Sequence, residues 1–332
     1  MAELRWNPMI KDWVMIASHR QNRPHMPKDW CPFCPGSGKV PDTYDVHKYD
    51  NDFPALSTTP PPCDFDALPA GSEDVYGTMA PSYGKCEVVL FSPDHHGNMC
   101  DLSDAHMNKL VDLWVERFEA LSQDKQIRFV YIFENRGEAV GVTMPHPHGQ
   151  IYAFSKLPKK IELELDAGKE YYDTHGRCLF CRMNELEQLF AKRVVYENED
   201  FLAYIPYFAD YAYGVYMVSK SHKINITQCN AREKENLGKA MRAVSGGYDA
   251  LFDTRFPYMM CMHNGPVNLE NQDEIQKQYH FHIEYYPPLR SKEKQQFQAS
   301  SETGVWAHCN PTAPEEKAEE LKKAILRFLQ QT

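Results

Sequence analysis

The sequence repeats one order of motifs, and this duplication constrains the fold more than any other feature. Each half has a Cys-x-x-Cys pair, a strand that ends near a histidine, a helix, a second strand and a His-x-His segment. In the first half these are Cys31-x-x-Cys34, the strand at residues 87–92 with His95, the strand at residues 129–133 and His146-x-His148. In the second half they are Cys178-x-x-Cys181, the strand at residues 213–219 with His222, the strand at residues 256–262 and His280-x-His282. Strand-rich units with one helix each predict an α+β fold in which two half-barrels share a mostly antiparallel sheet with packed helices. We expect the units at residues 1–165 and 166–332.

Apolar residues recur at helical spacing between the two strands of each half. The rows are Met107, Leu110, Val111, Trp114, Phe118 and Leu121 in the first half, and Leu237, Met241, Val244, Tyr248 and Leu251 in the second. Ser103 is the expected N-cap of the first helix. A C-terminal amphipathic helix is expected from Pro314 to about residue 330. Residues 55–83, which include Pro60-Pro61-Pro62, predict a long irregular loop near the functional site, with a surface excursion as the alternative.

Composition excludes several classes of partner. The formal net charge of −10 opposes binding to nucleic acid or to an anionic membrane surface. No segment approaches the ~20 apolar residues of a membrane span, and the N-terminus lacks the pattern of a secretory signal. Four of the ten cysteines form the two Cys-x-x-Cys pairs and the rest are scattered, which favours reduced thiols and metal over a disulfide scaffold. We therefore expect a cytoplasmic protein.

His146-Pro147-His148-Gly149-Gln150 indicates chemistry on a phosphate. The two imidazoles are expected to point to opposite faces of an extended segment, so that one can hold a metal while its neighbour meets substrate. Gly149 is expected to let an anionic group approach the backbone. Gln150 offers an amide donor that does not titrate near pH 7. These residues favour phosphoryl or nucleotidyl transfer. The alternative for a single His-x-His segment is a polar edge strand.

The motifs together resemble the galactose-1-phosphate uridylyltransferases, a branch of the histidine triad superfamily. The resemblance rests on ordered motifs over some 270 residues. They are Trp13-Val14, Ser18-His19-Arg20, Cys31-Pro32-Phe33-Cys34, Asn51-Asp52-Phe53-Pro54, Ser92-Pro93-Asp94-His95, Phe133-Glu134-Asn135-Arg136-Gly137 with His146 to Gln150, His263-Asn264-Gly265-Pro266, and His280-Phe281-His282 with Tyr286-Pro287-Pro288. The two-repeat fold, the activity and the zinc below are what this resemblance implies.

The resemblance implies two zinc ions per chain, each in a tetrahedral site that two thiolates and two imidazoles fill. The ligands are Cys31, Cys34, His95 and His146 at the first site, and Cys178, Cys181, His222 and His280 at the second. His96 competes with His95, and the Ser-Pro-x-His pattern of the family favours His95. Some members lack the second cysteine pair and bind a metal through a glutamate and three histidines, which here are Glu164, His263, His280 and His282. Both ligand sets stay open for the second metal.

Because filled zinc sites leave no position for substrate, the chemistry is assigned to His148. Its imidazole attacks the α-phosphorus of a nucleotide sugar, which gives a uridylyl-histidine and releases a sugar 1-phosphate. Gln150 stabilises the nonbridging oxygens. Histidine triad hydrolases carry a third histidine where this chain has Gln150, so a transferase is favoured. The second half lacks the Gly-Gln pair, and we expect it to be a non-catalytic copy.

The family pattern also assigns substrate contacts. Asn51 and Asp52 meet the ribose hydroxyls, and Arg20, Asn135, Gly141 and Thr143 line the phosphates. Glu302 is the expected hexose contact, in a segment, residues 294–310, that departs from the best-known members. The predicted activity is exchange of UMP between UDP-glucose and galactose 1-phosphate by a homodimer. The alternatives are an ADP-glucose phosphorylase, another nucleotidyltransferase acting on sugar phosphates, or a zinc-dependent binding module.

Overall fold

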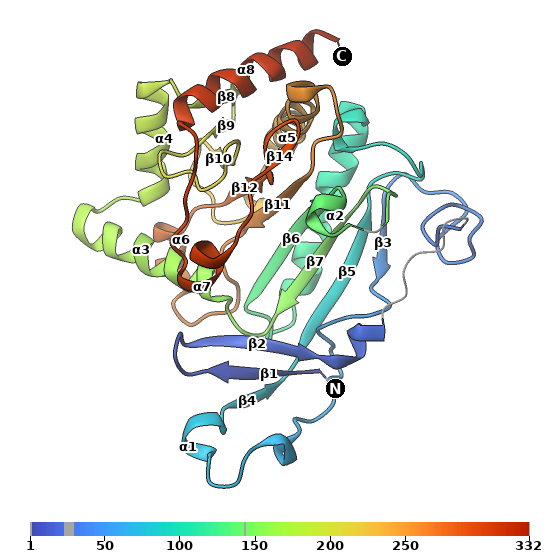
Figure 1. The fold of residues 1–332 in the computed structure, drawn as a ribbon, viewed down its shortest axis with the longest axis vertical. Helices are drawn as coiled ribbons and strands as arrows, with labels where there is room; N and C mark the ends of the chain where they lie inside the picture. Colours follow the sequence, from blue (N-terminus) through green and yellow to red (C-terminus); the bar gives the residue numbers. More distant parts are fainter. Residues whose placement is uncertain (1, 23–29, 143, 332) are drawn as a thin grey trace.

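One nine-stranded sheet runs through both halves of the chain (Figure 1). The computed structural model describes residues 2–22, 30–142 and 144–331. In spatial order the strands are β3 (His47–Asp50), β5 (Gly84–Leu90), β7 (His148–Phe154), β6 (Phe129–Arg136), β11 (Tyr258–His263), β12 (His282–Tyr286), β10 (Val215–Ser219), β9 (Phe201–Tyr204) and β8 (Val194–Glu197). Each neighbouring pair is antiparallel. The expected α+β fold with a shared antiparallel sheet is confirmed.

The strand order repeats about the junction between β6 and β11. Read toward this junction, the first half runs β3-β5-β7-β6 and the second half runs β9-β10-β12-β11. The register also repeats, since Gln150 pairs with Phe133 in the first half and Glu284 pairs with Cys261 in the second. His148 and His282 therefore occupy equivalent places. The boundary at residue 165 stays a prediction.

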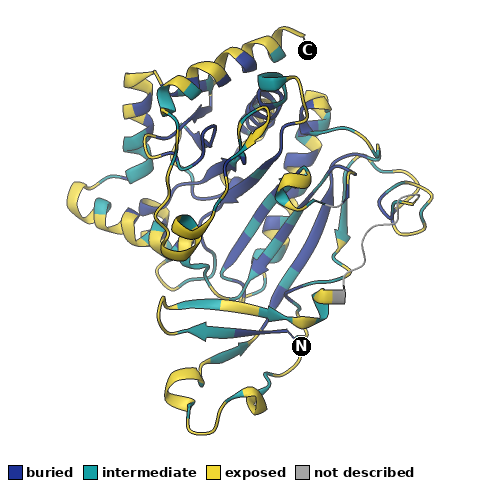
Figure 2. Ribbon diagram, in the orientation of Figure 1, coloured by how far each residue is buried: buried dark blue, intermediate teal, exposed yellow. Residues whose placement is uncertain are grey.

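Helices cover one face of the sheet and leave the other face of β7 for the site. Helices α2 (Asp104–Ser122) and α5 (Ala231–Phe252) share a hydrophobic core with the strands, and α8 (Pro314–Gln331) packs on α5. Side chains of a strand alternate between faces, so Gly149, Ile151 and Ala153 point into this core. His148, Gln150 and Tyr152 are partly buried on the opposite face. In Figure 2 the strands of the large sheet are mostly buried or intermediate, and exposed residues gather on the surrounding helices and loops.

Side-chain caps mark the start of both long helices, and the sequence predicts the first of them. The Ser103 hydroxyl accepts a hydrogen bond from the backbone nitrogen of His106 at 3.2 Å, which confirms the N-cap. Asn230 and Glu233 form a reciprocal capping box at the start of α5. The predicted apolar rows are buried except for Leu121 and Leu251, which are partly buried.

The remaining elements flank the large sheet. The strands β1 (Ala2–Asn7), β2 (Asp12–Ala17) and β4 (Met79–Pro81) form a small sheet in the order β2-β1-β4, and β13 (Leu289–Ser291) pairs with β14 (Lys294–Gln295). The other helices are α1 (Glu73–Tyr76), α3 (Lys159–His175), α4 (Leu179–Phe190), α6 (Gln272–Gln278) and α7 (Ser300–Val305).

Residues 55–83 are mostly irregular, as predicted, but they adjoin the end of β5 away from His148. They contain α1 and β4, and β4 pairs with β1 at the small sheet. The segment leads into Gly84, which pairs with Phe154, whereas Leu90 at the other end of β5 pairs with His148. Six residues of strand span roughly 20 Å. The prolines and glycines of this segment thus mark turns at the end of the sheet remote from His148.

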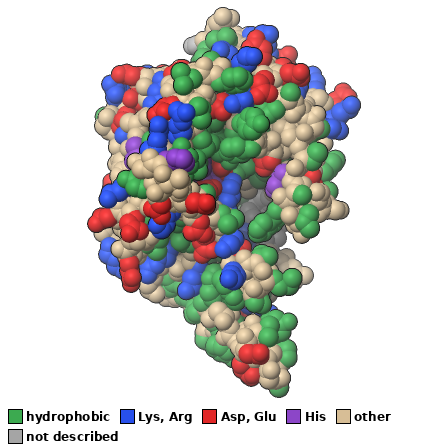
Figure 3. Space-filling model, turned by 90° about the vertical axis from the view of Figure 1, so that its left-hand side faces the viewer, with side chains coloured by type: hydrophobic (Ala, Val, Ile, Leu, Met, Phe, Trp, Pro, Cys, Tyr) green, Lys and Arg blue, Asp and Glu red, His purple; other side chains and the backbone are tan. Residues whose placement is uncertain are grey.

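The surface carries side chains of both charges. On the face drawn in Figure 3, acidic and basic side chains lie interspersed around a hollow that hydrophobic side chains border. Among the described residues, no helix is both long and apolar enough to cross a membrane.

Candidate active site and metal centres

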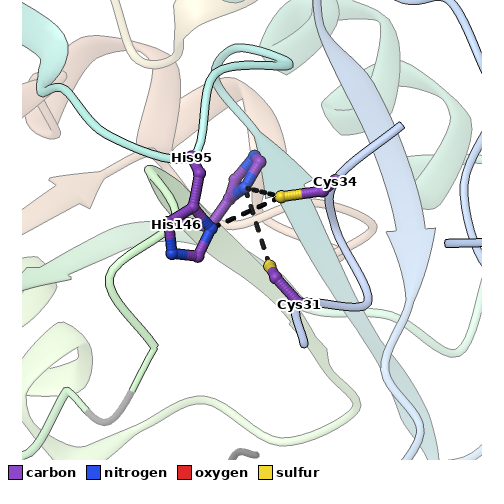
Figure 4. Close-up of side chains that lie close together, drawn as sticks. All are labelled: Cys31, Cys34, His95 and His146. Atoms are coloured by element: carbon purple, nitrogen blue, oxygen red, sulfur yellow. Dashed lines mark hydrogen bonds between the residues drawn. The ribbon is translucent and has the colours of Figure 1, made fainter. Parts of the chain in front are cut away.

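Two thiols and two imidazoles of the first half converge on one point (Figure 4). The Cys34 sulfur lies 3.4 Å from Nδ1 of His95 and 3.7 Å from Nδ1 of His146, and the Cys31 sulfur lies 3.8 Å from Nδ1 of His146. Tetrahedral bonds of typical zinc–sulfur and zinc–nitrogen length separate such ligand atoms by about 3.6 Å. The spacing and the donor set therefore fit one tetrahedral metal ion. The ring of His96 packs edge-on against His95, outside this group.

Short-range contacts orient the His146 ring, and burial keeps it neutral. Its Nε2 lies 2.9 Å from the Ser92 carbonyl oxygen and 3.3 Å from the Tyr44 hydroxyl. A carbonyl oxygen only accepts, so Nε2 carries the proton and Nδ1 presents its lone pair to the thiol side. Burial lowers the pKa of His146 to about 4, which keeps the ring neutral at physiological pH.

A backbone carbonyl also orients His148. Its Nδ1 donates to the carbonyl oxygen of His146 at 2.8 Å, which places the proton on Nδ1 and the lone pair on Nε2. The expectation that strand geometry points the two imidazoles to opposite faces is wrong, because residues two apart share a face of a strand. The chain bends at His146, and β7 begins only at His148.

Gly149 does not have the predicted role. A Cβ atom there would lie 2.9 Å from the Phe133 carbonyl oxygen and 3.0 Å from the Phe91 ring. Gly149 is buried on the helix-covered face of β7. Its small size permits the close approach of β6 and Phe91, and it does not open the backbone to an anion.

His148 lines a pocket of about 260 Å³ at the end of β6 and the start of β7. The other lining residues are Gly97, Asn98, Glu134, Asn135, Arg136, Gly137, Glu138, Val142, Met144, Pro145, His146, Pro147 and Arg255. Asn135, one of the predicted phosphate contacts, is therefore in the same pocket as His148.

A buried polar network supports the floor of this pocket. The Tyr258 hydroxyl donates to Glu134 at 2.9 Å, and Arg136 donates two hydrogen bonds to Asp249 at 2.6 and 2.7 Å. Burial raises the pKa of Glu134 to about 7. The sequence analysis named Glu134 and Arg136 only as parts of a motif.

Three other predicted substrate contacts, Arg20, Asn51 and Asp52, lie toward the Tyr152 end of β7. Arg20 donates to the Tyr152 hydroxyl at 3.5 Å, so it lies beside the partly buried face that also carries His148 and Gln150. Asn51 and Asp52 follow Asp50, which pairs with Glu87, and Glu87 pairs with Ile151. This pairing puts Asn51 and Asp52 nearer the Tyr152 end of β7 than its His148 end. The Asp52 carboxylate accepts from the Tyr49 hydroxyl.

Two of the remaining predicted contacts, Gly141 and Glu302, are not in the lining of the pocket that contains His148. Gly141 ends a short 3-10 turn with φ of 80° and is absent from that lining. Thr143 lies outside the described residues. Glu302, which we expected to be a buried carboxylate, is partly buried and accepts from the backbone nitrogen of Ala299 at the start of α7. That helix is short, and its own unpaired backbone donors recruit the carboxylate.

The second half reproduces the first metal cluster contact by contact. The Cys181 sulfur lies 3.4 Å from Nδ1 of His222 and 3.5 Å from Nδ1 of His280, and the Cys178 sulfur lies 3.8 Å from Nδ1 of His280. Nε2 of His280 lies 2.9 Å from the Ser219 carbonyl oxygen, as that of His146 does from Ser92. A hydrogen bond from Cys181 lowers the pKa of the Cys178 thiol. This donor set also fits a tetrahedral metal ion.

The alternative ligand set through Glu164 does not assemble as predicted. Glu164, His263 and His282 do come together, but Glu284 completes the group and His280 turns to the thiols. His263 lies between Glu164, 2.9 Å from Nδ1, and Glu284, 3.1 Å from Nε2. Although burial opposes it, these two carboxylates raise the pKa of His263 to about 9. The Lys160 amine also donates to Glu284.

Sequence reasoning missed several groups that shape both sites. The carbonyls of Ser92, Ser219 and His146 leave no mark in a sequence, because every residue has one. Glu284 was detectable, since the repeat aligns it with Gln150. Arg255 was not singled out either, although it is part of the pocket lining.

Sequence comparisons place the chain in one known family. Residues 1–158 match the family model "Galactose-1-phosphate uridyl transferase, N-terminal domain", and residues 164–323 match its C-terminal domain. The chain is 39% identical to a galactose-1-phosphate uridylyltransferase of Thermotoga maritima over 97% of this chain and 98% of that one. It is 30% identical to that of Haemophilus influenzae over 86% and 83%.

Solved structures give the same result for the fold. A uridylyltransferase structure superposes with a TM-score of 0.87 at 28% identity and covers 98% of this chain and 99% of that one. An ADP-glucose phosphorylase from Arabidopsis thaliana, solved with bound ADP-glucose, superposes with a TM-score of 0.73 at 22% identity over 97% and 98%. At that identity the second likeness concerns the fold alone.

Proposed function

This chain belongs to the galactose-1-phosphate uridyl transferase family, and from that premise we propose that it exchanges UMP between UDP-glucose and galactose 1-phosphate through His148. The observation that supports His148 most directly is that its ring is both oriented by a backbone carbonyl and placed at the edge of a pocket. The His146 carbonyl binds Nδ1, so the nucleophilic lone pair is on Nε2, and the ring lines a pocket that also contains Asn135.

The reaction needs two displacements at one phosphorus. Nε2 of His148 attacks the α-phosphorus of UDP-glucose, the bond from phosphorus to the bridging oxygen breaks, and glucose 1-phosphate leaves with that electron pair. An oxygen of galactose 1-phosphate then attacks the same phosphorus, and the phosphorus–nitrogen bond breaks. Gln150, two residues along the same face of β7, donates to the nonbridging oxygens.

The residues along β7 suggest the direction in which the nucleotide lies. The phosphates belong at the His148 end with Gln150 and Asn135. Asn51 and Asp52 lie toward Tyr152, where a carboxylate suits ribose hydroxyls, and Arg20 supplies positive charge beside the same face. Gly141, Thr143 and Glu302 keep their proposed phosphate and hexose contacts as hypotheses from the family pattern.

Zinc would be held by Cys31, Cys34, His95 and His146 in the first half and by Cys178, Cys181, His222 and His280 in the second. Each ion would supply a structural cross-link, because four protein ligands fill a tetrahedral shell. The His146 side chain would then be fixed at both ring nitrogens, which also fixes the carbonyl that orients His148.

An exchange assay tests the activity. With UDP-glucose and galactose 1-phosphate we expect ping-pong kinetics with parallel lines in double-reciprocal plots. Exchange with ADP-glucose and inorganic phosphate, but none with UDP-glucose and galactose 1-phosphate, would contradict the proposal and favour a phosphorylase. A homodimer in the cytoplasm is part of the proposal, and sedimentation analysis measures the oligomeric state.

A further inference from the structure

Arg255 brings a cation of the second half into the pocket of the first half. It lies just before β11, in which Tyr258 pairs with Arg136 at the end of β6. The residues ahead of Tyr258 therefore continue past the end of β6, where a Cβ atom on Gly137 would lie 2.9 Å from the Pro257 Cβ. This register puts Arg255 in the lining of the pocket that contains His148.

The other charged residues of the pocket have partners or face solvent. Arg136 is buried and forms an ion pair with Asp249 at 2.6 Å, and Glu134 accepts from Tyr258. Glu138 is exposed at the rim. Arg255 is exposed, and no carboxylate among the described residues lies within ion-pair distance of its guanidinium. In a chain with a net charge of −10, Arg255 is the one arginine of the pocket lining without an ion-pair partner among the described residues.

The sugar 1-phosphate that leaves in the first step is expected to lie on the side of the α-phosphorus that faces Arg255. In the proposed function the nucleoside extends from His148 along β7 toward Asn51 and Asp52. The sugar phosphate must then extend from the α-phosphorus in another direction, and the pocket beyond the start of β7 is adjacent to His148. A guanidinium binds phosphate oxygens with two parallel hydrogen bonds, which a lysine amine does not reproduce.

We propose that Arg255 binds the phosphoryl group of the sugar 1-phosphate, both as it leaves the nucleotide sugar and as the acceptor enters. This inference rests on the proposed function. When the bond to the bridging oxygen breaks, negative charge grows on the departing phosphate, and Arg255 neutralises it. The second half thus contributes a substrate-binding residue to the active site of the first.

Equilibrium binding of glucose 1-phosphate to the full-length enzyme, measured by calorimetry without nucleotide, tests Arg255 independently of turnover. Losing a charge-assisted contact should weaken binding by on the order of tenfold to hundredfold in Arg255→Ala, with Arg255→Lys between that variant and wild type. Arg290→Ala is the matched control, because Arg290 is an exposed arginine of β13 outside the pocket. It should bind as wild type does.

Steady-state kinetics supply the second measurement. Arg255→Ala should raise the KM for galactose 1-phosphate by a similar factor while Arg290→Ala leaves it unchanged. Wild type that binds no glucose 1-phosphate, or Arg255→Ala that binds it within twofold of wild type, overturns the role of Arg255. Failure of wild type to form a uridylyl-enzyme from UDP-glucose overturns the proposed function instead, so the two failures are distinguishable.

Discussion

The two His-x-His segments share a backbone and differ in what surrounds their second histidine. His148 and His282 both donate from Nδ1 to the carbonyl two residues before, at 2.8 and 2.9 Å. His148 is partly buried and borders a pocket, whereas His282 is fully buried between Phe180, Tyr216 and His263. The orienting contact is therefore not sufficient for a nucleophile, which also needs access to substrate.

The neighbours differ in charge as well. Gln150 in the first half is aligned with Glu284 in the second, and continuing the register aligns Asn135 with His263. Two neutral amides beside His148 suit an anionic phosphate. Beside His282, Glu284 pairs with His263 and Lys160, and Glu164 closes the group. Carboxylates there would repel a phosphate, and we therefore expect the second half to keep the scaffold without catalysing the reaction.

The largest expected difference between the halves is in turnover. His148→Ala should lower turnover by on the order of 10⁴-fold or more, because no other nucleophile replaces the imidazole. His282→Ala should keep most of the turnover and lose stability, since it leaves a buried cavity. A steady-state assay with thermal unfolding of both variants checks this, and equal loss of turnover at folded His282→Ala would show that the halves are not functionally distinct.

Removing a cysteine from either proposed zinc site should lower the metal content equally, but only the change in the first half should slow the reaction. Elemental analysis of wild type should find about two zinc equivalents, and Cys31→Ser and Cys178→Ser should each lose about one with several kcal/mol of stability. Only Cys31→Ser should strongly slow uridylylation, because His146 orients His148. The exposed Cys309 supplies the control, and Cys309→Ser should change neither quantity. Wild type without metal would contradict both assignments.

The buried charges of the second half should matter to stability at pH 7. Glu284→Gln removes a carboxylate whose pKa burial tends to raise but His263 and Lys160 hold well below its usual value. Breaking such a buried pair costs about 3–5 kcal/mol. Denaturant unfolding measures the loss, and Glu185→Gln, at an exposed ion pair, should change stability by less than about 1 kcal/mol. Similar values for the two variants would refute the buried network.

The buried carboxyl of Glu134 in the first half should destabilise the folded protein when it is ionised, whereas ionised Glu284 stabilises it. The pKa of Glu134 is about 7 in the folded protein against an ordinary 4.5, so the folded state binds a proton that the unfolded state loses. Wild type therefore loses stability as pH rises from about 4.5 to above 7, by about 3 kcal/mol at most. Glu134→Gln, which keeps an acceptor for Tyr258, should lack this loss. Parallel stability–pH curves for the two proteins would disprove the raised pKa.

Much of the fold follows from local patterns in the sequence. The duplication, the helical rows and Ser103 depend on residues near one another in the chain, and the structure confirms them. The two groups of two cysteines and two histidines are the ones that the family resemblance implies, and the structure brings each group together. His95 rather than His96 could be chosen only through the family pattern, since both are adjacent to the same turn.

The rest depends on packing between distant segments. The burial of His282, the pairing of Glu284 with His263 and the position of Arg255 all follow from the register of β11 against β6 and β12. That register is set by the whole sheet, and a local window does not encode it. Residues 55–83 were misplaced for the same reason, because their composition predicts turns without predicting which end of β5 they adjoin.

The location of the covalent intermediate tests the central claim that only the first half is catalytic. Wild-type enzyme is mixed with UDP-glucose labelled at the α-phosphate, without acceptor, and the labelled peptide is identified. We predict an acid-labile, base-stable label on His148 alone, released on addition of galactose 1-phosphate. A label on His282 would contradict the account.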